Sequence, residues 1–285
     1  RTRVPSGGEY EVYGGERGLA VGAAAGAVGD LFMAVSGERS DGWIPLGAGR
    51  GAADTELYYR GLGGALRWTP QLGDQQLAVR LSGYQEKRGA GLVGADSRAT
   101  GATLSATLVD QPEGEGTGWR LQGWVKRSDF ENRSAAVAAG RNSTTPASEQ
   151  YSTPAMGYGF NAALRRDAAD GGWEVGADAR IFDGETREKF RYMAGAFTRD
   201  RVAGGTQSVL GAYGEAYRNL GDWLLTGGVR IDRWATYDGH RTERDASTGV
   251  VTLDNRPSDR DGWLPTGRVG ARYSVSDDLY LRGAA

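Results

Sequence analysis

The chain has 285 residues, with 47 Gly, 8 Trp, 13 Tyr and no Cys, and its formal net charge is −2. It contains no run of about eighteen apolar residues, which excludes a transmembrane helix, and the lack of cysteine excludes a disulfide scaffold and a thiolate metal site. The balanced charge gives no reason to expect a nucleic-acid partner.

Alternation of apolar and polar residues between turn signals predicts about thirteen strands and no helix. In chain order the predicted strands are residues 8–14, 18–28, 30–40, 55–68, 75–88, 97–109, 117–130, 152–166, 172–186, 206–219, 222–236, 262–275 and 279–285.

The connections between these strands alternate in length from the second strand onward. Tight turns such as "AVGD", "TPQLGD" and "NLGD" are rich in the residues that turns require. Between them lie long polar connections, predicted as loops, at residues 40–54, 88–97, 129–150, 183–205 and 237–261. Short turns at one end and long loops at the other are typical of outer-membrane barrels, so the predicted fold is an all-β, antiparallel transmembrane β-barrel.

Each predicted strand has one apolar and one polar face. In "GRVGARYSVS", for example, Val269, Ala271 and Tyr273 share one parity and Arg268 and Arg272 the other. A soluble sandwich would bury the apolar face, whereas a barrel turns it to lipid and encloses the polar face. The residues predicted to face a barrel lumen are Glu174, Asp178, Arg180, Arg230, Asp232, Arg268 and Arg272.

Four tryptophans adjoin tight turns and share the parity of the apolar face: Trp68, Trp119, Trp173 and Trp223. Indole rings are favoured at membrane interfaces, so these four are predicted to form an interface girdle. A simple preference of tryptophan for strands is the alternative. Trp43, Trp234 and Trp263 fall near the long connections and are candidates for the opposite girdle.

The connection "FDGETREKFRYMAGAFTRDRVAGG" interleaves cationic and aromatic residues. Stacking surfaces beside guanidinium groups suit an anionic, aromatic ligand such as a metal chelate. Binding of lipopolysaccharide phosphates and simple solubility remain alternatives. The candidate ligand contacts are Arg187, Lys189, Phe190, Arg191, Tyr192, Arg199 and Arg201.

No cofactor, metal or catalytic site is predicted. Gly89, Gly91 and Gly94 form a G-x-G-x-x-G motif, but a strand pattern follows it where a dinucleotide site needs a helix. His240 is the only histidine, and no cysteine exists to complete a metal site with it. Paired carboxylates such as Glu174 and Asp178 fit a ladder of opposite charges better than acid–base chemistry.

Two segments near the end of the chain resemble the mid-barrel of TonB-dependent outer-membrane receptors. Residues 211–234 contain Gly-x-Tyr-x-Glu and, after a turn, Gly-x-Arg-x-Asp; residues 262–285 contain Pro-x-Gly-Arg-x-Gly-x-x-Tyr. The matching positions are Gly211, Tyr213 and Glu215, then Gly228, Arg230 and Asp232, and then Pro265, Gly267, Arg268, Gly270 and Tyr273.

The resemblance implies a barrel of about twenty-two strands with an N-terminal plug. Residues 1–285 are then expected to be about thirteen strands of such a barrel, with the plug, the TonB box and the C-terminal strands outside them. The implied function is import of a scarce ligand, such as a ferric siderophore or cobalamin, across the outer membrane of a Gram-negative bacterium, without enzymatic chemistry.

The partners implied are outer-membrane lipid and lipopolysaccharide, the protein's own plug, TonB, and a small-molecule or metal-chelate ligand. A passive porin and a soluble all-β binding module or adhesin are the alternatives.

Overall fold

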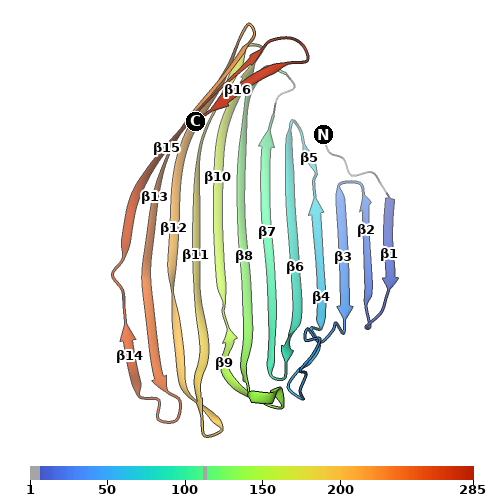
Figure 1. The fold of residues 1–285 in the computed structure, drawn as a ribbon. Coiled ribbons are helices and arrows are strands. Elements are labelled where there is room, and N and C mark those ends of the chain that lie inside the picture. Colours follow the sequence, from blue (N-terminus) through green and yellow to red (C-terminus); the bar gives the residue numbers. More distant parts are fainter. Residues whose placement is uncertain (1–6, 112–113) are drawn as a thin grey trace.

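The computed structural model describes residues 7–111 and 114–285, which form one antiparallel sheet (Figure 1). Thirteen strands pair in chain order along its main path, which confirms the predicted fold and strand number. These strands are β1 (Gly7–Gly14), β2 (Ala20–Val28), β3 (Leu31–Ser40), β4 (Tyr59–Trp68), β6 (Gln75–Leu92), β7 (Ala95–Asp110), β8 (Gly116–Val137), β10 (Ala155–Ala168), β11 (Gly171–Met193), β12 (Ala196–Leu220), β13 (Trp223–Asp245), β15 (Arg260–Ser274) and β16 (Tyr280–Ala284).

Three short strands flank the main path: β5 (Gln71–Leu72), β9 (Thr144–Ser152) and β14 (Val251–Asn255). The one helical segment among the described residues is a 3₁₀ turn at Ala139–Arg141. No described helix is both long and apolar enough to cross a membrane.

Tight turns lie along one edge of the sheet, the upper edge in Figure 1. Three of them use a Gly-Asp pair whose glycine has a positive φ: Gly29 (59°), Gly73 (64°) and Gly221 (60°). Glycine takes this left-handed conformation without the steric cost that a Cβ brings. Each of these turns joins two consecutive strands, so strands that are neighbours in sequence also pair in the sheet.

The opposite edge differs from the prediction of long loops. At four of the five predicted loops the strands continue past the predicted ends and close in hairpins: β6 with β7, β8 with β9, β11 with β12, and β13 with β14. The loop prediction was wrong there because both faces of these extensions carry polar residues, so that no period-two contrast marks them as strands. Residues 41–58 alone form a long irregular connection, interrupted by an isolated bridge at Asp54.

The described sheet is a single layer with almost no core. Its buried hydrophobic residues are Ala27, Ala53 and Ala95, while large apolar side chains such as Val229 (71% exposed) and Val269 (65% exposed) are uncovered. A soluble sandwich would bury these side chains against a second sheet, and none is present among residues 7–111 and 114–285. The described residues therefore do not form the sandwich that the alternative of a soluble module requires.

The apolar face forms a band of nearly constant length. Directly paired residues of antiparallel strands share a face, which allows the band to be followed across the sheet. From the tryptophan at the tight-turn end, the first charge on this face comes eight to ten residues along the strand, as in Trp68 and Arg60 on β4, Trp119 and Arg127 on β8, and Trp223 and Arg233 on β13. This length is about 27–34 Å along a strand. At the usual tilt it corresponds to about 20–28 Å across a bilayer, the height of a lipid-facing belt.

Candidate functional site

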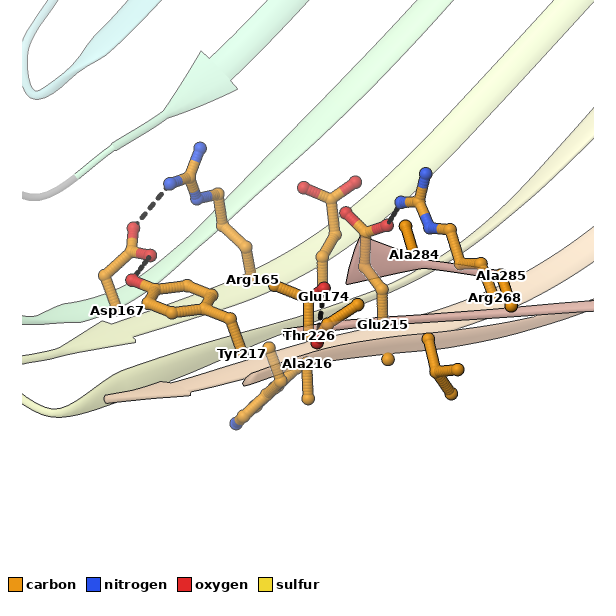
Figure 2. A pocket seen from close by; sticks show the side chains of 14 residues that line it. Arg165, Asp167, Glu174, Glu215, Ala216, Tyr217, Thr226, Arg268, Ala284 and Ala285 are labelled. Atoms are coloured by element: carbon orange, nitrogen blue, oxygen red, sulfur yellow. Dashed lines mark hydrogen bonds and ion pairs between the residues drawn. The ribbon is translucent and has the colours of Figure 1, made fainter. Parts of the chain in front are cut away.

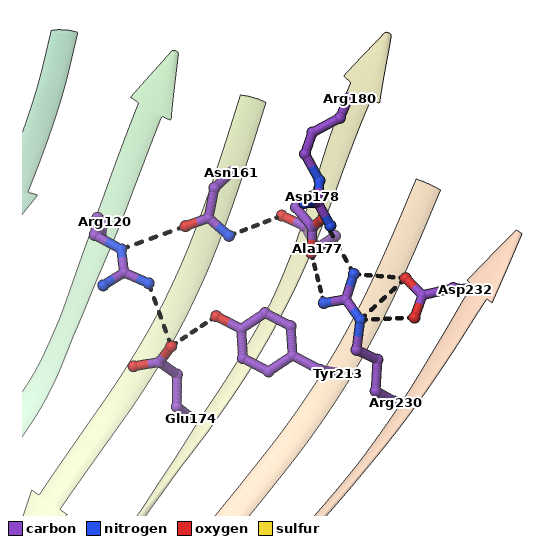
Figure 3. A network of polar contacts seen from close by, with 9 residues as sticks. All are labelled: Arg120, Asn161, Glu174, Ala177, Asp178, Arg180, Tyr213, Arg230 and Asp232. Carbon is purple, nitrogen blue, oxygen red and sulfur yellow. Dashed lines mark hydrogen bonds and ion pairs between the residues drawn. The ribbon is translucent and has the colours of Figure 1, made fainter. Parts of the chain in front are cut away.

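The polar face of the sheet carries an ion-pair cluster on β11 and β13 (Figure 3). Arg230 on β13 reaches across β12 to Asp178 on β11: its Nη1 lies 2.7 Å from Asp178 Oδ2, and its Nη2 lies 2.6 Å from Asp232 Oδ1. Gly211 lies between these two carboxylates in the register, and a Cβ there would collide with the Arg230 guanidinium. The glycine leaves the space through which Arg230 bridges two acidic groups.

A second cluster lies next to the first on the same face. The Tyr213 hydroxyl donates a hydrogen bond to Glu174 Oε1 at 2.6 Å, and Arg120 Nη2 lies 3.5 Å from the same oxygen (Figure 3). Arg120 Nε also donates to Asn161 Oδ1 at 3.3 Å. Gly176 lies under the Tyr213 ring, where a Cβ would collide with it. Charges and hydrogen-bonding groups from four neighbouring strands are thereby joined on one face.

The tight-turn end of the polar face holds smaller groups of charges (Figure 2). Arg165 Nη2 lies 2.5 Å from Asp167 Oδ2, and the Tyr217 hydroxyl donates to Asp167 Oδ1 at 3.2 Å. A depression of about 460 Å³ adjoins them, but Glu174 and Trp173 both line it although they lie on opposite faces. Residues of both faces line the depression, so it is no enclosed ligand pocket.

All seven residues predicted to face the lumen lie on this polar face. The remaining members make local contacts: Arg180 Nη2 lies 3.7 Å from Asp178 Oδ1, Arg268 forms an ion pair with Glu215, and the Arg272 guanidinium lies 5.7 Å from the centre of the Tyr280 ring. The structure thus gathers Asp178, Arg180, Arg230 and Asp232 in one cluster and places Glu174, Arg268 and Arg272 apart from it.

The four tryptophans predicted as a girdle lie on the apolar face at the tight-turn edge. Trp223 packs against Tyr273, with ring centres 4.8 Å apart. Trp263 lies on the apolar face near the other edge, where the Arg233 guanidinium is 5.5 Å from its ring centre. Trp234 pairs directly with Val209, and Val209 pairs directly with Arg180, which lies on the polar face. Trp234 therefore also lies on the polar face. Its proposed place in an opposite girdle is therefore wrong.

The predicted ligand-contacting residues belong to the hairpin formed by the ends of β11 and β12. Phe190 and Tyr192 extend the polar face, together with Arg199 and Arg201. The Arg201 guanidinium lies 4.3 Å from the centre of the Phe190 ring. Tyr192 and Phe197 form an edge-to-face pair with ring centres 5.2 Å apart. Aromatic and cationic groups are therefore combined at one end of the polar face.

The register separates the rest of the predicted group from this surface. Arg187 and Lys189 alternate with Glu188 and Phe190 along β11 and so lie on the opposite face. The Lys189 ammonium lies 5.7 Å from the centre of the Tyr151 ring. Arg191 has a positive φ of 58° beside the hairpin turn. Sequence proximity alone had grouped side chains that the strand period divides.

The arginines on the polar side of this hairpin already have acidic partners. Arg199 Nη1 lies 2.5 Å from Asp245 Oδ2, and Arg201 forms ion pairs with Glu188 and Glu243. The Ser247 hydroxyl and the backbone N–H groups of Thr248 and Ser247 hold the pKa of Asp245 well below its usual range. Asp245 is therefore ionised, so an anionic ligand would share Arg199 with a permanent carboxylate.

An ion pair fixes the irregular connection of residues 41–58 to its neighbours. The Asp54 carboxylate is buried and accepts hydrogen bonds from Arg141 Nε at 3.0 Å and from the Gly51 N–H at 2.9 Å. Arg141 first, and then the Gly51 N–H, lowers the pKa of Asp54 to about 2. The Ala53 carbonyl accepts from the Val93 N–H at the tip of β6–β7. These contacts hold the connection against two hairpins that are distant in sequence.

With this geometry in view, comparison with known proteins identifies the sheet. A family model described as "TonB dependent receptor-like, beta-barrel" matches residues 47–285. The chain belongs to this family. Its members are transport receptors of the Gram-negative outer membrane and not enzymes, which confirms the predicted class and location. No match was found among the curated proteins.

Solved structures similar to this receptor barrel share its fold at low sequence identity. The ferric-catecholate import receptor Fiu from E. coli K12 is 13% identical with a TM-score of 0.72, over 99% of this chain and 50% of its own. The copper transporter OprC is 16% identical with a TM-score of 0.75, over 100% and 47%. The ferric yersiniabactin uptake receptor FyuA from Yersinia pestis is 15% identical with a TM-score of 0.67, over 99% and 47%. The chain thus spans about half the length of these receptors.

Sequence analysis missed several members of the polar clusters of the receptor barrel. Arg120 and Asn161 lie on strands whose polar faces were not assigned, and Tyr213 was noted only as part of a motif. The available signal was parity: each shares the face of its strand that opposes the apolar band. Asp54 and Arg141 carried no such signal, since they lie outside regular strands and 87 residues apart.

Proposed function

We propose that the complete protein is an outer-membrane receptor that imports a scarce ligand, such as a ferric siderophore or cobalamin, and that TonB energises the import. The family match over residues 47–285 carries this proposal. The solved relatives named above include a ferric-catecholate import receptor and a copper transporter, which supports a metal or its chelate as the cargo.

The polar face is proposed to line the barrel lumen and to contact a plug domain. Charges of both signs, paired as Asp178 with Arg230 and Glu174 with Arg120, offer hydrogen-bonding partners to a plug without forming an apolar core. Such contacts can be exchanged for water at modest cost, because exposed ion pairs contribute little each. The four tryptophans of the tight-turn edge are proposed to lie at the periplasmic interface.

The ligand is proposed to meet the barrel at the polar side of the β11–β12 hairpin. Phe190, Tyr192, Arg199 and Arg201 supply ring faces and guanidinium groups on one surface. Arg187, Lys189 and Arg191, which were grouped with them from sequence, are proposed to contribute less because the strand period turns the first two away. A planar anionic chelate fits this combination of stacking and charge.

The proposal is tested by measuring the affinity of the complete receptor for a ferric catecholate. One structural relative is a ferric-catecholate import receptor. In the double variant Phe190→Ala/Arg201→Gln, affinity is expected to fall about tenfold or more, since both a stacking surface and a charge are lost. The matched control is Arg187→Gln/Lys189→Gln on the other face of the same strand. Equal affinity in the double variant and the parent would remove this hairpin from the ligand site.

A further inference from the structure

Four basic side chains form one continuous register row on the apolar face of the receptor barrel. Arg39 pairs directly with Arg60, Arg60 with Lys87, and Lys87 with Arg98, from β3 through β4 and β6 to β7. All four are exposed. In sequence they are separated by tens of residues, so only the strand register brings them together. We call these four residues the basic row.

The basic row has an excess of positive charge. Like charges directly opposite each other on a sheet are destabilising. Among the described residues, the ion pair formed by this row joins Arg98 to Glu131 at 3.9 Å, at the end of the row. Glu38 and Glu86 lie on the polar face, since each is adjacent in sequence to a member of the row. Two acids near Arg98 share the face of the row but have other partners: Asp96 forms an ion pair with Arg133, and Asp129 accepts hydrogen bonds from Ser152 and Thr153. The arrangement calls for an external anion.

The position of the row indicates which anion is within reach. On β4, Arg60 lies two residues before the exposed Leu62 and eight residues before Trp68. That separation is about 27 Å along the strand, or about 20 Å across a bilayer at the usual tilt. The row therefore lies just beyond the apolar belt, at the edge where the long hairpins emerge, and it faces the lipid side.

A second row on the same face provides an internal contrast. Asp96, Arg133, Glu149, Lys189, Asp200 and Arg244 pair directly in that order from β7 to β13, and their charges alternate. Arg133 lies 3.0 Å from Glu149 and 3.8 Å from Asp96. This alternating row neutralises itself within the protein. An alternating pattern of charges is enough to make an extracellular edge soluble. A need for solubility therefore does not explain four adjacent cations.

We propose that the basic row binds the phosphate groups of a phosphorylated glycolipid in the outer leaflet. The inference rests on the outer-membrane placement of the proposed receptor. Guanidinium groups of Arg39, Arg60 and Arg98 and the Lys87 ammonium donate charge-assisted hydrogen bonds to phosphate oxygens. The acyl chains of the same lipid lie along the apolar band below the row. The glycolipid would thus be bound through both its phosphate groups and its acyl chains, whereas a soluble anion would be bound through its charge alone.

The test measures binding of diphosphoryl lipid A to the purified complete receptor in detergent, by native mass spectrometry. The triple variant Arg60→Gln/Lys87→Gln/Arg98→Gln is expected to bind at least about tenfold more weakly. The matched control, Arg133→Gln/Lys189→Gln/Arg244→Gln, removes three cations from the alternating row and is expected to change affinity less than about twofold. Lipid A without phosphates is expected to bind the parent as weakly as diphosphoryl lipid A binds the triple variant.

Two results overturn the proposal. One is equal affinity of the parent and the triple variant for diphosphoryl lipid A; the other is displacement of the lipid by an equimolar amount of inorganic phosphate, which identifies a soluble-anion site. Insertion of each variant into phosphatidylcholine vesicles is measured in parallel. Normal insertion with unchanged lipid A binding defeats only this inference, whereas failure of the parent to insert defeats the proposed receptor itself.

Discussion

The basic row and the alternating row lie next to each other on the same face, yet they treat charge in opposite ways. In the basic row, Arg60 and Lys87 face each other without an acidic partner, whereas in the alternating row Lys189 lies between Glu149 and Asp200. The two rows meet at β7, where Arg98 and Asp96 are two residues apart. In a barrel the strands are tilted, so a row of directly paired residues moves away from the membrane as it passes from strand to strand. The alternating row therefore continues into the hairpins of β11–β13, away from the apolar belt.

The two rows mark the level at which the surroundings of the barrel change from lipid to water. Hairpins that extend into water satisfy their own charges, as the pairs of Arg133 show. The basic row, at the boundary of the apolar belt, has no such internal compensation among the described residues apart from the pair of Arg98 with Glu131. Anionic lipid of the outer leaflet is proposed to supply the missing negative charge. Charge pattern along one face thus marks successive levels: apolar band, boundary and solvent.

The largest expected effect comes from breaking the apolar band on which this comparison depends. Val229 is 71% exposed and lies within the band of β13, so Val229→Arg places a cation in hydrocarbon. We expect a loss of about 2–4 kcal/mol in the free energy of folding into lipid vesicles, measured by urea titration. Thr226→Arg, on the polar face of the same strand, is the control. A similar loss in both variants would contradict the assignment of the faces.

A smaller loss is expected from the polar face, where charges are paired within the protein as in the alternating row. Arg230→Gln leaves Asp178 and Asp232 without their shared cation, and we expect a loss of about 1–3 kcal/mol in the free energy of unfolding. In a double-mutant cycle with Asp178→Asn the two losses should not add, since the residues act on one contact. Additive losses in detergent-solubilised protein would show that the cluster contributes no coupling.

Residues 41–58 offer a local test of a paired charge near the boundary. Asp54→Asn is expected to release this connection from Arg141 and to increase its rate of proteolytic cleavage several-fold, while Glu56→Gln in the same connection leaves the rate unchanged. The ordinary pKa of Asp54 is 3.8 and its folded pKa is about 2. The stabilising contribution is therefore complete above the ordinary value and is lost as the pH falls through about 2. Cleavage that accelerates already between pH 6 and pH 5, two values far above this range, would contradict the role of Asp54.

The smallest expected effect compares the two rows directly, in zwitterionic detergent without glycolipid. Lys87→Glu places an acid between Arg60 and Arg98 and should raise the free energy of unfolding by about 0.2–1 kcal/mol. Lys189→Glu places an acid between Glu149 and Asp200 and should lower it by a similar amount. Equal signs for the two substitutions in urea titrations would show that cross-strand charge does not distinguish the rows.

The membrane-spanning part of the fold could be predicted from sequence because lipid and water impose a two-residue period on each strand. This period assigned Trp173 to the apolar face, and Asp178 and Arg230 to the polar face, from the sequence alone. The hairpin extensions could not be predicted in this way, since water contacts both of their faces and removes the contrast. The basic row was hidden for another reason: Arg39, Arg60 and Lys87 become neighbours only through register, which local pattern does not determine.

The central claim is that the apolar face contacts lipid while the polar face encloses water. Residues 1–285 contain no cysteine, so Val229→Cys or Thr226→Cys provides one attachment site for a nitroxide within them, and any cysteine elsewhere in the complete receptor is first replaced by serine. Electron paramagnetic resonance of the complete receptor in phosphatidylcholine bilayers measures collisions with oxygen, which concentrates in lipid, and with a water-soluble nickel chelate. The account predicts dominant oxygen collisions at 229 and dominant nickel collisions at 226. Dominant nickel collisions at 229 would contradict it.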